Sequence, residues 1–480
     1  LILGWVFVPF YTRSMVYTMP EFLERRYNPQ SRTILSVISL VSYVLTKVAV
    51  TVYAGGLVFQ QVFGIKELWG IDFFWIAAIG LVVLTALYTI FGGMKSVLYT
   101  SVLQTPILLL GSLIILVLGF KELGGWDEMM RVCGAVTVND YGDTMTNLIR
   151  SNDDANFPWL GALIGSAIIG FWYWCTDQFI VQRVLSGKNE MEARRGTIFG
   201  AYLKLLPVFL FLIPGMIAFA LHQKYIGAGG EGFLPMLANG TANADAAFPT
   251  LVAKLLPAGV KGLVVCGILA ALMSSLASLF NSSAMLFTID FYKRFKPETP
   301  EKKLVGIGQI ATIVIVVLGI LWIPIMRSVG DVLYTYLQDV QSVLAPGIAA
   351  AFLLGICWKR TSAQGGMWGL ISGMVIGLTR LGAKVYYSNA GEVADSTFKY
   401  LFYDMNWLFF CGWMFLFCII VVIVVSLATE APTAEKIQGL VFGTATKKQK
   451  AATRASWNHW DIIHTVIILA ITAAFYWYFW

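Results

Sequence analysis

Charged side chains are scarce in this chain of 480 residues: Asp, Glu, Lys and Arg together make up 13% of it, against roughly 25% in an average soluble domain. Hydrophobic residues make up 58%. This balance excludes the soluble, disordered and fibrous classes of protein. At roughly 20 apolar residues per membrane crossing, the chain instead has room for about a dozen helices and their connections.

Signatures of catalysis and of metal binding are also missing. The sequence has no G-x-x-x-x-G-K-[ST] phosphate-binding loop, and its three histidines are not spaced as ligands of zinc or haem. All six cysteines but Cys133 fall in apolar stretches, so no extracellular disulfide framework can be read. The net charge of +7 points to basic cytoplasmic loops before it points to nucleic acid. We therefore expect neither an enzyme nor a nucleic-acid partner.

Apolar runs long enough to cross a bilayer follow one another along the chain. They are predicted to be helices, because only helices and closed barrels satisfy backbone polar groups in lipid and these runs are far too long for barrel strands. The sequence therefore predicts an all-α, polytopic membrane protein. The runs cover residues 34–63, 71–92, 97–119, 158–182, 197–221, 259–289, 304–326, 331–357, 364–382, 405–428 and 461–480.

Basic residues cluster in alternate connections between these runs. They lie at residues 13–32, 188–195, 293–303 and 436–454, whereas the long loops 120–157 and 222–258 together carry acids with few bases. If each run crosses the membrane once, every basic cluster falls on the same side. The positive-inside rule assigns that side to the cytoplasm.

Polar residues inside the apolar runs mark candidate functional positions, because lipid offers them no partner and they must face a cavity or each other. The first cluster is Gly170-Phe-Trp-Tyr-Trp-Cys-Thr-Asp-Gln178, in the run 158–182. Its aromatic rings suit stacking on the C–H face of a sugar, and Asp177 and Gln178 suit hydrogen bonds to sugar hydroxyls. An aromatic belt at the membrane interface explains the rings equally well, whereas the Asp177–Gln178 pair favours a cavity.

Lys204 and Gln338 are two further polar residues within apolar runs. The simpler explanation of Lys204 is a lysine whose ammonium reaches the cytoplasmic interface, and the alternative is a buried lysine that donates to a hydroxyl or pairs with Asp177. Gln338 either bonds a hydroxyl of a ligand or ties two helices together. The sequence alone leaves both residues open.

Four small residues of the run 259–289 share one helical face, by their i, i+3 and i+4 spacing: Ala271, Ser274, Ser275 and Ser278. Serine hydroxyls and a backbone carbonyl suit a hard monovalent cation such as sodium. Small residues at this spacing are also the ordinary material of close helix packing. On spacing alone, packing is the simpler explanation.

The chain nevertheless resembles the sodium/solute symporter family, and in particular its sodium/glucose cotransporter branch. The resemblance implies a LeuT-type inverted-repeat bundle with discontinuous helices at the midplane and alternating access around a central site. The matching stretches run in order from about residue 17 to 360: Tyr17-Thr-Met-Pro-Glu21, Ala86-Leu-Tyr-Thr-Ile-Phe-Gly-Gly93, Trp172-Tyr-Trp-Cys-Thr-Asp-Gln178 with Val181-Gln-Arg183, Tyr202-Leu-Lys-Leu-Leu-Pro207, Met273-Ser-Ser-Leu-Ala-Ser278 with Phe280-Asn-Ser282, and Phe352-Leu-Leu-Gly with Trp358-Lys-Arg360.

The resemblance also implies a role for each polar cluster. Trp174 would stack on the sugar ring, with Tyr173 as an aromatic gate beneath it, and the other polar side chains would bond the sugar hydroxyls. These implied roles reverse the preference for packing and for an interfacial lysine. The implied substrate-binding residues are Tyr173, Trp174, Asp177, Gln178, Lys204 and Gln338, and the implied sodium ligands are the carbonyl of Ala271 and the hydroxyls of Ser274 and Ser275.

The chain departs from the family pattern at three further positions. Members with a second sodium site carry an aspartate where this chain has Ser101 and a hydroxyl residue where it has Ala277. Because a carboxylate and a neighbouring oxygen are both lost, we expect one sodium per sugar. Gly170 stands where relatives often carry Asn or Thr facing the sugar, so we expect one contact fewer and an altered affinity or selectivity.

The start of the chain is a fourth departure, because the family's first core helix and much of its second have no counterpart here. Residues 1–12 read as the tail of a helix begun upstream, so an N-terminally incomplete chain that cannot transport by itself is expected. Residues 34–357 are predicted to hold the remaining core helices, and 364–480 the peripheral C-terminal helices. Together residues 1–480 are expected to form a single transmembrane transporter domain.

The function implied by the resemblance is secondary active transport: sodium-coupled symport of a monosaccharide such as glucose or galactose. Alternatives are a symporter of myo-inositol, another polyol or a sialic acid, and a sugar-gated sensor or channel that does not concentrate its ligand. Sodium would be the coupling ion, with no other cofactor. The expected partners are sodium, a small sugar and the lipid bilayer, with no obligate protein partner. The expected location is the plasma membrane, or the inner membrane of a bacterium.

Overall fold

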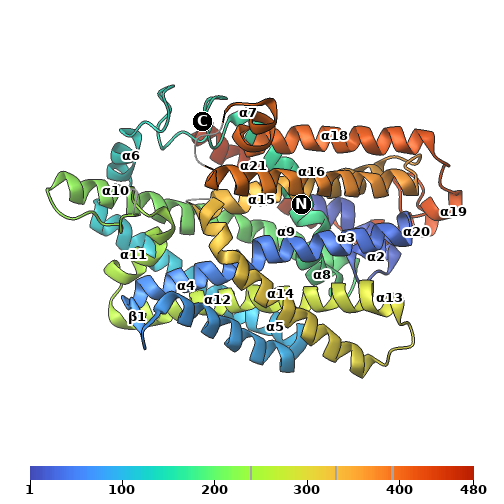
Figure 1. Cartoon of the computed structure of the whole chain (residues 1–480), viewed down its shortest axis with the longest axis horizontal. Coiled ribbons are helices and arrows are strands. Elements are labelled where there is room, and N and C mark those ends of the chain that lie inside the picture. Colours follow the sequence, from blue (N-terminus) through green and yellow to red (C-terminus); the bar gives the residue numbers. More distant parts are fainter. Residues whose placement is uncertain (238–239, 330–331, 391–393, 480) are drawn as a thin grey trace. The chain divides into compact units, whose positions relative to one another are not determined.

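The chain is almost entirely helical in the computed structural model (Figure 1). The structure describes residues 1–237, 240–329, 332–390 and 394–479, and at residues 88, 90–98, 100, 103 and 327–329 it describes the backbone alone. The strands within these residues are β1 (Glu67–Leu68) and β2 (Ile71–Asp72), which pair as a short antiparallel hairpin. The predicted all-α class is confirmed.

The chain forms two compact units, each assembled from separate segments of the sequence. Unit 1 comprises residues 1–46, 152–202 and 282–473, and unit 2 comprises residues 47–151, 203–281 and 474–480. The chain passes between the units once in a loop, between residues 151 and 152, and four times inside helical elements. These elements are η2 (Tyr43–Val48), α9 (Glu190–Pro207), α12 (Ala258–Met285) and α21 (His459–Tyr478).

The remaining elements belong wholly to one unit; those labelled η are π-helical turns, except η5, which is a 3₁₀ turn. Unit 1 contains η1 (Leu3–Phe7), α1 (Val8–Ser14), α2 (Met19–Arg26), α3 (Pro29–Ser42), α7 (Trp159–Phe171), η3 (Trp172–Thr176), α8 (Gln178–Leu185), η6 (Leu286–Tyr292), α13 (Lys293–Phe295), α14 (Glu301–Val329), α15 (Leu333–Cys357), α16 (Ala363–Asn389), α17 (Thr397–Lys399), η7 (Tyr400–Asp404), α18 (Trp407–Ala428), α19 (Ala434–Ile437) and α20 (Lys447–Ala455). Unit 2 contains, besides the hairpin, α4 (Ala49–Phe63), α5 (Phe73–Leu123), α6 (Trp126–Gly134), η4 (Val208–Leu212), α10 (Ile213–Gly227), η5 (Ala244–Ala246) and α11 (Ala247–Leu255).

Nine helical stretches of the described residues are long and apolar enough to cross a membrane. Each overlaps one of the predicted runs, and the two other runs, 71–92 and 364–382, are helical as part of α5 and as α16. The prediction of a polytopic membrane protein is therefore confirmed. The nine stretches are Pro29–Phe63, Gln104–Leu123, Trp159–Thr176, Glu190–Gly227, Ala258–Phe295, Glu301–Met326, Leu333–Cys357, Trp407–Ala428 and His459–Tyr478.

The prediction is wrong about the connection between the runs 71–92 and 97–119. α5 continues for 51 residues, from Phe73 to Leu123, with no end between the two runs. The residues at this junction include Gly92 and Gly93 but no proline, and glycine, unlike proline, keeps the N–H that a helical hydrogen bond needs. The orientation inferred from the charged loops counted two crossings here, and it stays a prediction.

Side-chain caps explain where several helices of unit 1 begin. Thr18 precedes α2 and accepts a hydrogen bond from the N–H of Glu21, while Asn28 precedes α3 and accepts one from the N–H of Ser31. Each cap satisfies a backbone donor that the first turn leaves without an intrahelical partner. A proline follows each cap within two residues, where its missing N–H costs nothing.

In unit 1, α15, α16 and α18 pack side by side (Figure 1). Glycines allow the backbones to approach: a Cβ placed on Gly373 of α16 would lie 2.6 Å from the Cα of Gly347 on α15. A Cβ on Gly377, one turn further along α16, would meet the carbonyl oxygen of Val343. Small residues at such crossings are typical of helix packing in membranes.

In unit 2, α12 packs on α5 through the same kind of contact. A Cβ on Gly111 of α5 would lie 2.8 Å from Cγ2 of Val264, and one on Gly267 of α12 would lie 3.1 Å from Cγ2 of Ile107. In the same core, α6 brings Cys133 to a position where it is fully buried. Burial raises the pKa of the Cys133 thiol to about 11, so this cysteine is unreactive at neutral pH.

Candidate functional site

The predicted crossing 158–182 is a broken helix. α7 and the π-helical turn η3 run to Thr176, Asp177 takes an extended conformation with φ −78° and ψ 126°, and α8 starts at Gln178. The break leaves carbonyl groups without helical partners, and the buried hydroxyl of Tyr11 donates to one of them, the carbonyl of Cys175. A helix interrupted within an apolar run fits the discontinuous helices that the family resemblance implies, although the sequence did not show which run is broken. Irregular backbone at such a point is typical of transport sites.

Aromatic side chains flank the break. Trp174 is 42% exposed, whereas the neighbouring Trp172 is buried. The rings of Tyr173 and Trp174 meet edge to face, with 5.3 Å between centroids and 84° between planes. The indole of Trp174 therefore offers an accessible surface held at a fixed angle by Tyr173, which suits stacking on an apolar face of a ligand.

Asp177 and Gln178 are both buried, and each has protein partners. One oxygen of Asp177, Oδ1, accepts hydrogen bonds from the hydroxyl of Tyr43 at 2.9 Å and from the N–H of Phe179 at 3.1 Å. Asp177 is thus the N-cap of α8. These contacts hold the two halves of the broken helix in place, and a contact of Asp177 with sugar stays a prediction.

Gln178 is fixed by the backbone that leads into α2. Its Oε1 accepts the N–H of Met19 at 2.8 Å, and its Nε2 donates to the carbonyl of Tyr17 at 3.3 Å. The side chain is 1% exposed, so both ends of the amide are satisfied inside the protein. A contact of Gln178 with sugar likewise stays a prediction.

The structure brings five of the six predicted sugar residues into unit 1. Gln338, on α15, is half-buried and donates from Nε2 to the hydroxyl of Tyr334 at 3.0 Å. Lys204 is exposed on α9 and lies in unit 2. The residue after Gln338, Asp339, was not singled out in the sequence, yet its carboxylate is 3.4 Å from Arg380 and 3.0 Å from Lys384, both on α16.

The predicted sodium ligands lie on α12 in unit 2. Ser274 is buried, Ala271 is half-buried and Ser275 is exposed. The hydroxyls of Ser274 and of Ser101, on α5, share a hydrogen bond of 2.5 Å, and Ser278 donates to the carbonyl of Ser274 at 3.0 Å. The face therefore both packs on α5 and gathers hydroxyl oxygens. The sequence had marked Ser101 only as a missing carboxylate.

These oxygens suit sodium better than a transition metal. Among the described residues, no group of three or more His, Cys, Asp or Glu side chains could hold a metal ion. Hydroxyl and carbonyl oxygens are the ligands that hard monovalent cations prefer, because they carry no full counter-charge.

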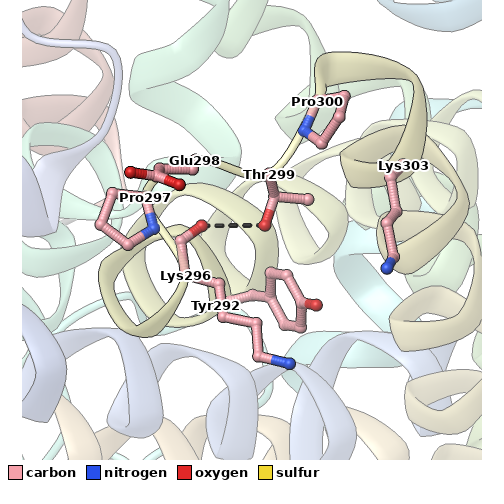
Figure 2. A pocket seen from close by; sticks show the side chains of 7 residues that line it. All are labelled: Tyr292, Lys296, Pro297, Glu298, Thr299, Pro300 and Lys303. Carbon is pink, nitrogen blue, oxygen red and sulfur yellow. Dashed lines mark hydrogen bonds between the residues drawn. The ribbon is translucent and has the colours of Figure 1, made fainter.

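A surface pocket lies in the basic connection between η6 and α14 (Figure 2). Its volume is about 410 Å³, and it is lined by Tyr292, Lys296, Pro297, Glu298, Thr299, Pro300 and Lys303. The hydroxyl of Thr299 donates to the carbonyl of Lys296 at 2.8 Å, which closes the turn. No predicted sugar or sodium residue lines this pocket.

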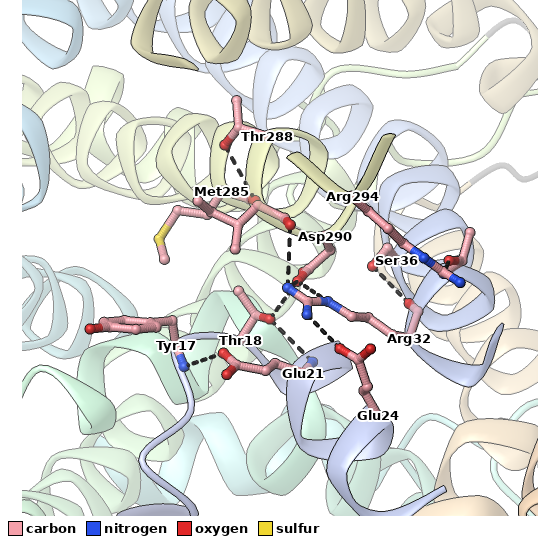
Figure 3. A network of polar contacts seen from close by, with 12 residues as sticks. Tyr17, Thr18, Glu21, Glu24, Arg32, Ser36, Met285, Thr288, Asp290 and Arg294 are labelled. Atoms are coloured by element: carbon pink, nitrogen blue, oxygen red, sulfur yellow. Dashed lines mark hydrogen bonds and ion pairs between the residues drawn. The ribbon is translucent and has the colours of Figure 1, made fainter. Parts of the chain in front are cut away.

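A buried ionic network is the main feature that the sequence analysis missed. Asp290, on η6, is fully buried and pairs with Arg32 of α3 at 2.6 Å; Arg32 also contacts Glu24 of α2 (Figure 3). The available signal was weak, because Arg32 and Asp290 stand 258 positions apart at the edges of apolar runs, where charges are common.

Comparison with known proteins gives a consistent result. The profile of the sodium:solute symporter family matches residues 1–373. The chain is 35% identical over 501 residues to a sodium/mannose cotransporter of Bos taurus, covering 100% of this chain and 83% of that protein. It is 37% identical over 447 residues to sodium/glucose cotransporter 1 of Ovis aries, and 35% identical over 456 residues to sodium/myo-inositol cotransporter 2 of Homo sapiens. Those alignments cover 90% and 92% of this chain, and 66% of each of those two proteins.

The fold also matches a solved structure. A Na⁺-coupled sialic acid symporter, in a substrate-bound outward-open state, superposes with a TM-score of 0.67 at 21% identity, over 90% of this chain and 81% of that one. This likeness confirms the predicted LeuT-type fold. The family consists of transporters, so the prediction that the chain is not an enzyme is also confirmed. The family profile and the identities together show that this chain belongs to the sodium:solute symporter family.

Proposed function

We propose that the protein carries out sodium-coupled symport of a sugar or polyol, with a monosaccharide such as glucose or galactose as substrate. The observation that carries the proposal is the helix broken at Asp177, with the accessible ring of Trp174 beside the break. A broken helix frees backbone polar groups, and an aromatic face binds the C–H surface of a sugar. The relatives named above are cotransporters of mannose, glucose and myo-inositol, and they support the same substrate class.

In this proposal the residues of unit 1 bind the sugar. Trp174 stacks on its ring above Tyr173, and Gln338 and Lys204 each bond a hydroxyl. Asp177 and Gln178 complete the polar wall while they hold the broken helix together. Sodium binds to the carbonyl of Ala271 and the hydroxyls of Ser274 and Ser275. The domain proposed is one transporter domain, in the plasma membrane or a bacterial inner membrane, with no protein partner required.

One sodium ion is enough to drive useful accumulation. At 100 mV, inside negative, the entry of one sodium contributes about 2.3 kcal/mol. A tenfold sugar gradient costs about 1.4 kcal/mol. The electrical term alone therefore exceeds the cost of a tenfold gradient, before the sodium concentration gradient is added.

The experiment that tests the proposal is uptake of labelled sugars by vesicles that contain the whole protein. An inward sodium gradient is expected to concentrate glucose or galactose above the outside level, and replacement of sodium by choline is expected to abolish this. Concentration of myo-inositol or a sialic acid alone would identify the alternative substrate. Sugar-induced current without accumulation would identify a sensor or channel, and absence of any flux would contradict symport by this chain.

The same vesicles test the ion stoichiometry. Because Ser101 and Ala277 offer fewer oxygen ligands than a second sodium site needs, the initial rate of uptake is expected to depend on sodium with a Hill coefficient close to one. A coefficient near two would show that a second ion is coupled despite the hydroxyl pair of Ser101 and Ser274.

Substitution of Gly170 by asparagine is expected to tighten sugar binding. A Cβ at this position meets no atom within 4 Å, so the side chain fits without displacing a neighbour. The added amide would supply one more hydrogen bond, which is worth a few-fold to about tenfold in affinity. Equilibrium binding of labelled sugar measures the change, and Gly215→Asn, at another position with open space, is the matched control. Equal affinity in wild type and Gly170→Asn would place Gly170 away from the sugar.

A further inference from the structure

Asp290 accepts all of its hydrogen bonds through one carboxylate oxygen. Its Oδ1 accepts from the hydroxyl of Thr18 at 2.8 Å and from Nε of Arg32 at 2.8 Å, and Nη2 of Arg32 lies 2.6 Å from the same oxygen (Figure 3). The other oxygen, Oδ2, is buried and has no hydrogen-bond partner within the described part of the chain. A buried carboxylate satisfied on one side only is costly. A rearrangement that brings a donor to Oδ2 would remove this cost.

Thr18 belongs to a short segment that is held from two directions. On one side its hydroxyl reaches Asp290, and on the other the flanking backbone groups of Tyr17 and Met19 bond the amide of Gln178. Thr18, Met19, Gln178 and Asp290 are each at most 1% exposed. Residues 17–19, which we name the latch segment, therefore connect the broken helix directly to the buried ionic network.

The two anchors of the latch segment are on irregular backbone. Gln178 follows the π-helical turn η3 and the break at Asp177, and Asp290 lies within the π-helical turn η6. π-helical turns are rare in proteins, and those that occur are often found at functional sites. Thr18 also caps α2, so movement of its hydroxyl would loosen the first turn of that helix.

The ends of these elements lie beside the basic clusters 13–32 and 293–303, which the positive-inside rule assigns to the cytoplasm. The latch segment thus lies between the broken helix and the predicted cytoplasmic surface. Thr18 and Met19 of this segment are buried in the arrangement seen, whereas the side chain of Tyr17 is exposed. A ligand that leaves the break towards the cytoplasm requires the segment to move.

We propose that the latch segment is the device that closes the cytoplasmic side of the broken helix, with Gln178 and Asp290 as its two positioning residues. When the bonds from Asp290 to Thr18 and from Gln178 to residues 17 and 19 open together, the break becomes accessible from the cytoplasm. Arg32, which is itself paired with Glu24, keeps Asp290 in place as the segment moves. The purpose of the latch rests on the proposed function, whereas its opening can be measured without sugar or sodium.

The native Cys175 is a built-in reporter of this opening. It lies two residues before Asp177, is 2% exposed, and its carbonyl is covered by the hydroxyl of Tyr11. In inside-out vesicles that contain the full chain, a membrane-impermeant maleimide is expected to label Cys175 slowly. Asp290→Asn, Thr18→Val and Gln178→Met are each expected to raise that rate by about tenfold or more, as for loss of a charge-assisted or buried hydrogen bond. Mass spectrometry assigns the label to its cysteine.

The other buried cysteines separate opening of the latch from general unfolding. Cys133, Cys411 and Cys418 are buried elsewhere in the chain. If the proposal is correct, the variants raise the labelling rate at Cys175 but not at these three buried cysteines, and only from the cytoplasmic side, whereas the exposed Cys266 and Cys357 are labelled equally in wild type and variants. Asp395→Asn, which removes an exposed carboxylate, leaves the rate at Cys175 unchanged. Equal labelling of wild type and variants, a parallel rise at the other buried cysteines, or labelling from the outside would each overturn the proposal. Failure of sugar uptake with selective labelling would instead count against the proposed function alone.

Discussion

Replacement of Asp339 by alanine is expected to lower the free energy of unfolding by about 3–5 kcal/mol, the usual cost of removing one partner of a buried ion pair. The guanidinium of Arg380 has no exposed surface, and Asp339 is the carboxylate beside it, at 3.4 Å. Without that carboxylate, Arg380 keeps its bonds to the carbonyls of Leu401 and Met405 but remains an uncompensated charge. Denaturant or thermal unfolding of the purified chain measures the loss.

Two further variants make this prediction specific. The double substitution Asp339→Ala with Arg380→Met removes the stranded charge, so it is expected to recover part of the stability. Asp395→Asn removes the carboxylate of an exposed pair with Lys399 and is expected to leave stability unchanged. A double variant less stable than Asp339→Ala would show that the charge is not the source of the effect. Because Asp339 is adjacent to Gln338, weaker sugar binding is expected to accompany the loss.

Substitution of Gly373 by leucine is expected to prevent folding of unit 1. Even a methyl group at this position would stand 2.6 Å from the Cα of Gly347 and 3.1 Å from its N, and these are backbone atoms that cannot give way. Gly373→Ala is the milder form, with an expected cost of about 1–3 kcal/mol for overpacking. The yield of monodisperse protein and its unfolding transition are the measurements.

Gly382 provides the matched control, because it lies on the same helix, α16, and a Cβ there meets nothing within 4 Å. Gly382→Ala is expected to be neutral or stabilising by up to about 1 kcal/mol, since alanine favours a helix over glycine. Equal stability of Gly373→Ala and Gly382→Ala would mean that the close approach of α15 and α16 is not maintained in the membrane.

Much of the fold could be predicted from the sequence, because each crossing is marked by a local run of apolar residues. The run 331–357 and the helix α15 agree in this way, as do the run 405–428 and α18. The runs 71–92 and 97–119 were wrongly separated, because a few residues without a strong helix breaker look the same in a turn and in the middle of α5. Length and hydropathy do not distinguish these two cases.

The candidate site was predicted less completely, because its contacts join residues far apart in the chain. Ser101 and Ser274 are separated by 173 positions, and Met19 and Gln178 by 159. Spacing along one helix places Ala271, Ser274 and Ser275 on one face, and their role as sodium ligands stays a prediction. It carried no information about which atom of another helix lies opposite, so Ser101 was read as a loss rather than as a partner.

The interleaving of the two units has a consequence for gene exchange among family members. A chimaera joined at a single point, whether near residue 47, 203 or 282, inherits pieces of both units, since each unit is encoded by three separate segments. Transfer of residues 1–46, 152–202 and 282–473 as a set moves Trp174 and Gln338 into a recipient while its serines equivalent to Ser274 and Ser275 stay in place. Under the proposed assignment of sites, recognition of the ion and most contacts with the sugar would in this way be inherited from different parents.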